Sequence, residues 1–336
     1  MRRFLLRLVT AIQLTRLTIA FGAVSDIWFV ILLTRAGQES THLAALGIAG
    51  PDRAPVDVAN LPLIAALVSG AIIAVGLFAY GASLNDVLDA RHDATFSPER
   101  PIPAGRIKIG QAVVVTVGAL IVAVLGGVWI GTWAVCLTLL TAAGLLFYNA
   151  TGKYIPAVGA VTIGLIHASH MFIPNHELQF TLPVWLVMTH AMAIATIVHM
   201  CEEKRPTFDN RAMVATIVGW LFWSLLLLGY GELGADQHLW PPTISPWNLV
   251  FPIGTVVAFV AVAWWKMSRV SGRAAAEKLK RYGAMWQSLY GAAWLFALGL
   301  RTEALWIGLF ALVGFGAMTL IKEVTGLTGR PLSYRV

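Results

Sequence analysis

Charged side chains are scarce in this sequence: Asp, Glu, Lys and Arg together make up 12% of its 336 residues. A typical soluble domain is about a quarter charged, so the composition argues against a soluble globular protein. Hydrophobic residues make up 58% of the chain, and its mean hydropathy is +0.74. These values predict an integral membrane protein that crosses the lipid bilayer many times.

Cysteine is also scarce. Cys136 lies inside an apolar run and Cys201 lies beside charged residues, so neither a disulfide framework nor a zinc site is expected. The net charge of +7 is compatible with nucleic-acid binding, but in a membrane protein it reflects the Lys and Arg excess of cytoplasmic loops. We therefore expect no nucleic-acid partner.

Long apolar runs are abundant instead. A membrane-spanning helix needs about 20 apolar residues, and the sequence contains ten such candidates. They lie near residues 17–34, 61–84, 111–130, 132–148, 155–173, 182–200, 212–230, 248–267, 284–300 and 304–321. The last pair is separated by a very short stretch, "LRTEA", so one long bent helix or a re-entrant pair is the alternative there.

The distribution of basic residues orients these spans. With the N-terminus in the cytoplasm, 21 of the 24 Lys and Arg residues fall in inner segments, and only Arg35, Arg53 and Arg301 fall outside. This asymmetry follows the positive-inside rule. We expect a multi-pass protein of the inner or plasma membrane, forming a single domain over residues 1–336. Residues 1–16 are predicted to form an amphipathic helix on the inner surface, or else an extension of the first span.

Four acid or amide side chains cluster where the second span ends. Asn85, Asp89 and Asp93 are spaced four residues apart, and Asp86 neighbours Asp89, so one helix would carry three carboxylates that repel one another. A solvated helix end is the ordinary explanation, but such an end tends to mix charge signs. Oxygen ligands of this kind suit Mg²⁺ shared with a substrate diphosphate, and Arg100 in the following Pro-rich loop suits phosphate oxygens.

The segment "NDVLDARHD", followed by "PERPIPAGRI", resembles the first aspartate-rich motif of the UbiA superfamily of intramembrane prenyltransferases. The segment "YNATGKYIP" at 148–156 is similar to that family's Tyr-and-Lys loop. The resemblance implies an all-α bundle of about nine spans, so a tenth span would be a departure. It also implies a cavity, open to lipid and capped on the cytoplasmic side, where two acidic motifs bind Mg²⁺ and a prenyl diphosphate.

The second acidic motif departs from the family pattern. This chain has "HMCEEKRPTFDNR" at 199–211, and either His199 and Glu203 or Met200 and Lys204 occupy the two usual aspartate positions. A charged inner loop is the alternative interpretation of this segment. Elsewhere, the intramembrane His167, His170 and His190, and His199 at the end of its span, are expected to make helix-interface hydrogen bonds rather than to bind metal.

The sequence thus predicts a Mg²⁺-dependent prenyltransferase that moves an isoprenoid from a prenyl diphosphate to a lipophilic, aromatic or quinone-precursor acceptor. Two alternatives remain open: a polyprenyl-phosphate phosphoribosyltransferase, and a degenerate member that binds or moves isoprenoid lipid without catalysis. The candidate catalytic residues are Asp86, Asp89, Asp93 and Lys153. The candidate metal ligands are Asn85, Asp86, Asp89, Asp93, Glu202 and Glu203. The candidate diphosphate-binding residues are Asn85, Arg91, Arg100, Tyr148, Lys153, Lys204 and Arg205.

Overall fold

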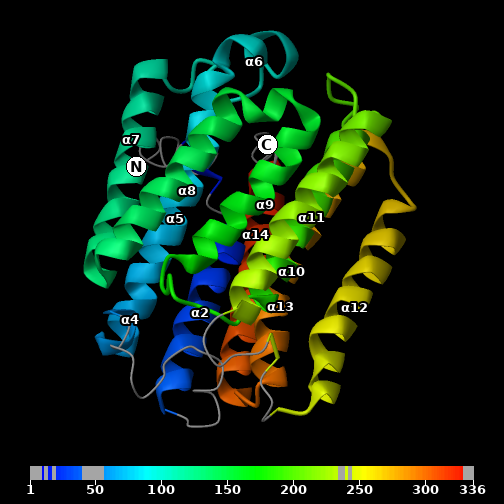
Figure 1. Cartoon of the computed structure of the whole chain (residues 1–336). Helices are drawn as coiled ribbons and strands as arrows, with labels where there is room; N and C mark the ends of the chain where they lie inside the picture. The colour runs from blue at the N-terminus through cyan, green and yellow to red at the C-terminus, as the bar shows by residue number, and fades with distance from the viewer. Residues whose placement is uncertain are drawn as a thin grey trace.

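A computed structural model describes residues 10, 14–16, 20–39, 57–233, 239–240 and 244–327. The proposed surface helix at residues 1–16 lies largely outside this set. The described elements are all helical, as the sequence predicted, and they form the bundle of long helices drawn in Figure 1.

A helix stands at each of the ten predicted spans. These helices are α2 (Phe21–Glu39), α5 (Leu63–Leu88), α7 (Ile109–Ile130), α8 (Thr132–Ala150), α9 (Pro156–Phe172), α10 (Leu182–Cys201), α11 (Asn210–Leu233), α12 (Val250–Met267), α13 (Gly272–Ala297) and α14 (Arg301–Leu327). The shorter elements are α4 (Asp57–Asn60), α6 (Ala90–Phe96), η2 (Gly152–Tyr154) and η3 (Pro246–Leu249). Within the described part of the chain, seven segments are long and apolar enough to cross a membrane by length and composition, and α9 is a shorter apolar helix.

The last predicted pair forms two separate helices. Between α13 and α14 the chain turns over three residues, where Gly299 has φ +84° and the amide of Leu300 bonds back to the carbonyl of Leu295. A glycine in this left-handed conformation is the usual way to end a helix. The alternative of one long bent helix is therefore wrong.

Small residues let the helices approach closely, as is common in membrane bundles. In the α5–α7 pair, a Cβ added at Gly76 would lie 2.8 Å from the backbone nitrogen of Ala123. Helix α13 contacts α2, α10, α12 and α14. Helices α7 and α12 lie at opposite edges of the bundle in Figure 1 and carry many exposed aliphatic and aromatic side chains. Such faces are expected where helices meet lipid.

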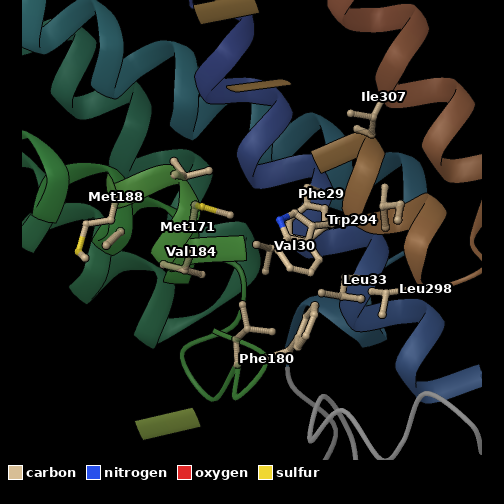
Figure 2. Packing of buried hydrophobic residues seen from close by; sticks show 14 of the residues in the cluster. Phe29, Val30, Leu33, Met171, Phe180, Val184, Met188, Trp294, Leu298 and Ile307 are labelled. Atoms are coloured by element: carbon tan, nitrogen blue, oxygen red, sulfur yellow. The ribbon is translucent and has the colours of Figure 1, made fainter. Parts of the chain in front are cut away.

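The main core lies where α2 meets α9, α10 and α13. Phe29 and Leu33 of α2 are fully buried in a cluster that also contains Phe180, Met188 and Trp294 (Figure 2). Because α2 is buried along most of its length, the start of this helix is held against the rest of the bundle. That placement matters for Arg16, which precedes it.

Candidate functional site

The first acidic motif lies at the junction of two helices. Asn85 and Asp86 lie in the last turn of α5, Asp89 is the single residue between α5 and α6, and Asp93 is inside α6. The amide of Asp93 still bonds to the carbonyl of Asp89 at 2.8 Å, so the helical path is interrupted but not lost. Asn85, Asp86 and Asp93 are buried.

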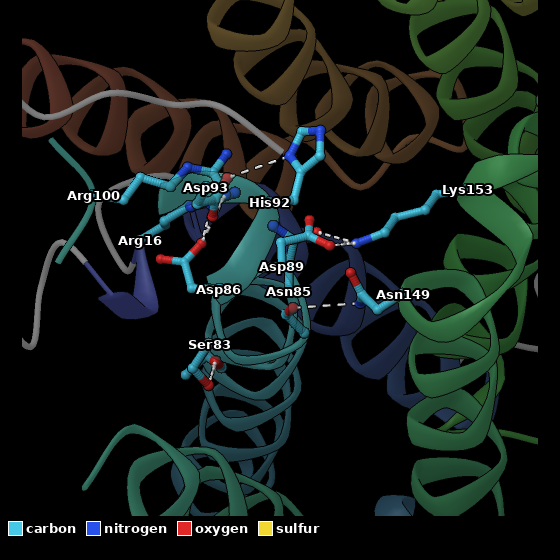
Figure 3. A network of polar contacts seen from close by, with 12 residues as sticks. Arg16, Ser83, Asn85, Asp86, Asp89, His92, Asp93, Arg100, Asn149 and Lys153 are labelled. Atoms are coloured by element: carbon cyan, nitrogen blue, oxygen red, sulfur yellow. Dashed lines mark hydrogen bonds and ion pairs between the residues drawn. The ribbon is translucent and has the colours of Figure 1, made fainter. Parts of the chain in front are cut away.

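Basic side chains pair with the carboxylates of this motif and offset the repulsion among them that the sequence predicted. Arg16 contacts Asp86 at 2.7 Å, and both side chains are buried. Arg100 bridges two acids, lying 3.3 Å from Asp86 and 2.7 Å from Asp93 (Figure 3). The "PERP" loop thus returns over α6, and Arg100 reaches the motif as its place in the sequence predicted.

The predicted Tyr-and-Lys loop supplies the third cation. Lys153, in η2, donates to Asp89 Oδ1 at 2.6 Å and to Asn85 Oδ1 at 3.2 Å, and the Tyr154 hydroxyl lies 3.4 Å from the same Asp89 oxygen. These contacts join residues more than 60 positions apart in sequence. The loop between α8 and α9 therefore lies against the end of α5.

The second acidic motif follows the end of α10. Glu202 is held by two lysines: Lys280 of α13 at 2.8 Å and Lys204 at 3.1 Å. Glu203 has φ +48°, a left-handed conformation that is unusual for a residue with a side chain. The His199 ring bonds to the carbonyl oxygen of Pro206 at 2.8 Å. The segment thus contacts α13 through Glu202 and is bonded within itself through His199.

Both motifs line one cavity of about 710 Å³. Ten of the predicted site residues are among its lining residues: Asn85, Asp89, Asp93, Arg100, Tyr148, Lys153, Glu202, Glu203, Lys204 and Arg205. Two predicted residues are not. Asp86 is buried beside Arg16, and Arg91 is exposed.

Burial and neighbouring charges shift the pKa values of several groups at this end of the bundle. Burial is the main reason that the pKa of Asp93 is raised, although Arg100 acts in the opposite direction. Burial likewise lowers the pKa of Lys153, against the effect of Asp89. Burial alone would raise the pKa of Glu202, but Lys280 and Lys204 together outweigh it and lower that pKa.

The donor chemistry suits a hard divalent cation. Carboxylate and amide oxygens of Asn85, Asp89 and Asp93 face the cavity, and the Asn85 side-chain nitrogen is buried without a partner among the described residues. Mg²⁺ prefers such oxygen ligands. Across the described part of the chain, however, no three His, Cys, Asp or Glu side chains are gathered closely enough to hold a metal. The oxygen donors are thus of the kind that Mg²⁺ prefers, but here the carboxylates are paired with side-chain cations instead of being gathered around one point.

Three basic residues of the cavity were not identified from the sequence. Arg16, Arg273 and Lys280 line it together with the predicted residues. In the sequence all three fit the positive-inside pattern, which accounts for basic residues without indicating what they contact. Two of the three are set apart by their position in the sequence. Arg16 directly precedes the first span, and Lys280 lies one turn before the last pair of spans.

The end of the cavity that lies in the middle of the bundle, away from the two acidic motifs, is called its inner end here, and it is polar. It is lined by His167, His170, His190 and Gln287. His190 makes the expected helix-interface bonds, to the Gly283 carbonyl oxygen and to the Tyr290 hydroxyl, each at 3.2 Å. His167 contacts Gln287 across the bundle at 2.9 Å.

Comparison with known proteins agrees with this geometry. The model of the UbiA prenyltransferase family matches residues 40–289. Digeranylgeranylglyceryl phosphate synthase of Sulfurisphaera tokodaii is 30% identical over 132 residues, which are 39% of this chain and 45% of that protein. The enzyme of the same name from Saccharolobus solfataricus is 33% identical over 107 residues, 31% of this chain and 36% of that protein. The matches thus span less than half of either relative.

A solved structure has a fold similar to that of this chain. It comes from work on digeranylgeranylglyceryl phosphate synthase in membranes and has a TM-score of 0.56 to this chain. The alignment covers 88% of this chain and 99% of that one at 17% sequence identity. The family match ends within α13, so α14 lies beyond the matched residues.

Proposed function

The chain belongs to the UbiA prenyltransferase family, and from this premise we propose that it transfers a prenyl group from a prenyl diphosphate to a lipophilic acceptor, with Mg²⁺. The observation that carries the proposal is the shape of the cavity. Its ionic groups lie at one end, and residues such as Leu77, Ile163 and Ile166 line it further in. A volume of about 710 Å³ lies within the range of about 300–1,000 Å³ for ligand sites. An ionic end and an apolar chamber match the two parts of a prenyl diphosphate.

We assign the metal to the cavity-facing oxygens of Asn85, Asp89 and Asp93, with Glu203 on the opposite side. Bound there, Mg²⁺ would supply positive charge to a leaving diphosphate. Asp86 has a different part in this proposal. Because it lies behind the cavity in contact with both Arg16 and Arg100, it positions these two guanidinium groups.

Arg100 and Lys153 are the residues proposed to contact the diphosphate directly. When the allylic C–O bond breaks, negative charge grows on the leaving oxygens and positive charge on the prenyl carbon. Cations that are already in place lower the free energy of that separation more than mobile water does. The planar guanidinium of Arg100 suits two phosphate oxygens at once, whereas Lys153 provides a single point charge.

The apolar chamber protects the prenyl cation from water. Leu77, Phe78 and Leu145 line it beside Tyr148. Exclusion of water suppresses hydrolysis of a reactive intermediate, and an aromatic face such as that of Tyr148 stabilises nearby positive charge. The acceptor then attacks the prenyl carbon and loses a proton, which the released diphosphate takes up before it leaves from the ionic end.

For the acceptor we propose a lipid that carries a phosphate group. Lys204, Arg205, Arg273 and Lys280 line the cavity around the second motif, and only Glu202 and Glu203 oppose them there. This excess of positive charge suits an anionic headgroup in addition to the diphosphate. The names of the curated relatives, which are digeranylgeranylglyceryl phosphate synthases, point the same way. An aromatic or quinone-precursor acceptor is the second candidate, favoured by the polar groups at the inner end of the cavity.

The test is prenyl transfer by the purified protein in lipid nanodiscs. Prenyl diphosphates of increasing chain length are paired with glycerol phosphate lipids and with aromatic acceptors, and both diphosphate release and product mass are followed. We expect Mg²⁺-dependent product with a phosphate-bearing acceptor, and its loss in Arg100→Ala. Arg91→Ala is the matched control, because Arg91 is exposed and outside the cavity lining. Absence of Mg²⁺-dependent diphosphate release with every donor would reject catalysis and favour a lipid-binding role.

A further inference from the structure

Polar side chains meet in the middle of the bundle, far from the ionic end of the cavity. His167 lies 11 residues along α9 from Pro156, which is about 16 Å at 1.5 Å per residue. Gln287 of α13 donates through Nε2 to Asp26 Oδ2 of α2 and contacts His167 Nδ1. Three helices thus contribute to one network, in which Asp26 and Gln287 are buried and His167 lines the cavity.

With the Gln287 amide nitrogen placed against Asp26 and His167, as it is here, one tautomer of His167 is favoured. The amide nitrogen of Gln287 carries two protons, and it directs one to the Asp26 carboxylate and one to His167 Nδ1. A neutral imidazole whose Nδ1 accepts a hydrogen bond carries its proton on Nε2. His167 lines the cavity, and no residue of the described ranges accepts a bond from that Nε2–H. The side chain therefore offers a hydrogen-bond donor to the cavity.

A second nitrogen lies one turn further along the same helix. His170 also lines the cavity and is only 5% exposed, yet its Nε2 is buried without a partner in the described structure. His190 shows the contrast, because the Gly283 carbonyl oxygen and the Tyr290 hydroxyl satisfy its two nitrogens. A buried polar atom without a partner costs free energy, so His170 Nε2 points to a missing ligand, and His167 offers a neighbouring donor on the cavity wall.

The charge at this depth limits what the ligand is. The Lys and Arg residues that line the cavity, among those described, are Arg16, Arg100, Lys153, Lys204, Arg205, Arg273 and Lys280. Arg100, Lys153, Lys204 and Arg205 belong to the two motifs and their loops, and Arg16 and Lys280 contact Asp86 and Glu202. Arg273 lies 14 residues before Gln287 on α13, about 21 Å at 1.5 Å per residue. Asp26 lies behind Gln287 rather than in the cavity lining. An anion would find no cation there, and a plain hydrocarbon would leave both imidazoles unsatisfied. A neutral oxygen that accepts a hydrogen bond fits both conditions.

We propose that His167 and His170 form a binding subsite for a neutral oxygen, a carbonyl or hydroxyl, carried by a lipophilic ligand in the inner cavity. Asp26 and Gln287 act as positioning residues, since they hold His167 with its Nε2–H toward the ligand. The inference rests on the proposed function only in treating this cavity as the place where the substrates meet. Binding at the subsite does not require prenyl transfer.

The experiment compares ligands that differ by one oxygen. Nanodisc-embedded protein is exposed to equal amounts of decylbenzene and decanophenone, and separately to tetradecane and 2-tetradecanone, and native mass spectrometry measures the bound fractions. The first pair places the carbonyl beside an aromatic ring, and the second places it on an alkyl chain. Together they show whether the subsite takes the oxygen of an aromatic ligand or that of an aliphatic one. We expect at least one ketone to bind about 10-fold more tightly than its hydrocarbon, the effect of one net hydrogen bond.

Variants locate the effect. His167→Leu should abolish the ketone preference, whereas His167→Gln should retain part of it, because the glutamine amide nitrogen lies near the position of Nε2. His176→Leu is the matched control, since His176 lies in the loop after α9 and stacks on Trp133 outside the cavity. Gel filtration confirms that each variant is folded, and His167→Gln keeps the test decisive if the leucine variant is not.

Two results would overturn the proposal: equal binding of ketone and hydrocarbon to the wild-type protein, or an unchanged preference in folded His167→Leu and His167→Gln. These results are separable from those that test the proposed function. A ketone preference without any prenyl transfer would reject the proposed transfer and retain the subsite. Prenyl transfer without a ketone preference would retain the proposed function and reject the subsite.

Discussion

The pairing of Glu202 with Lys280 predicts a large stability loss on removal of the carboxylate. Both side chains are 10% exposed and their charged atoms are 2.8 Å apart. Glu202→Gln leaves Lys280 as a buried cation without its carboxylate, and breaking such a pair costs about 3–5 kcal/mol. Lys204 adds little, because it is 35% exposed and surface pairs contribute about 0–1 kcal/mol. We expect the Glu202→Gln protein to unfold at least about 5 °C below the wild type.

The reverse and double changes separate the pair from its surroundings. Lys280→Met should cost less, because Glu202 keeps its 3.1 Å contact with Lys204. The combination of Glu202→Leu with Lys280→Met should recover most of the loss, since an apolar pair of similar volume often replaces a buried ion pair at no cost. Thermal unfolding in one detergent, followed by tryptophan fluorescence, measures all four proteins without added Mg²⁺. A Glu202→Gln midpoint equal to that of the wild type would show that the pairing is unimportant and return Glu202 to the candidate metal ligands.

Three further predictions concern the site and its orientation. Most Mg²⁺-dependent turnover should be lost in each of Asp86→Ala, Asp89→Ala and Asp93→Ala. Only Asp86→Ala should also lower the unfolding temperature clearly, because it leaves buried Arg16 unpaired. Wild-type turnover in all three variants would reject the motif assignment. Lys204→Ala or Arg205→Ala should slow turnover about 10²-fold, as much as Glu203→Ala, if a fixed cation replaces a second metal; two cooperative Mg²⁺ ions with both basic variants silent would contradict this. To test the orientation, single cysteines are introduced at exposed Thr95, Thr207 and Ala274 in a protein lacking Cys136 and Cys201. Each should react with impermeant maleimide only from the cytoplasmic side, and labelling of any of them from outside would refute the orientation.

Local patterns in the sequence were enough to predict the helices and the first motif. Apolar runs define spans because hydrocarbon thickness sets a minimum length, and each predicted run coincides with a helix. The spacing of Asn85, Asp89 and Asp93 identified the motif, and the resemblance to a known family led to Lys153. These signals all lie within one helix or one loop, where sequence spacing translates directly into position.

Contacts between distant segments were not predictable in this way. Arg16 reaches Asp86 across 70 residues, Lys280 reaches Glu202 across 78, and Gln287 reaches Asp26 across 261. Each depends on how whole helices pack, which periodicity along one helix does not specify. The same limit explains why the pairing of the aspartates was missed: the neighbouring acids were visible in the sequence, but Arg16 was not recognisable as the partner of Asp86.

The ion pairs of the first motif also affect how its ligands would assemble. Arg100 and Lys153 already occupy Asp86, Asp89 and Asp93, so a divalent cation alone would gain carboxylates only by competing with these two side chains. A diphosphate alone would gain Arg100 and Lys153 only by depriving the carboxylates of them. When both bind together, the metal replaces Arg100 and Lys153 as the partner of the carboxylates, and the diphosphate replaces the carboxylates as the partner of Arg100 and Lys153. Linkage then requires that each raise the other's affinity by the same factor, so the site would respond cooperatively to the metal–diphosphate complex and weakly to either component.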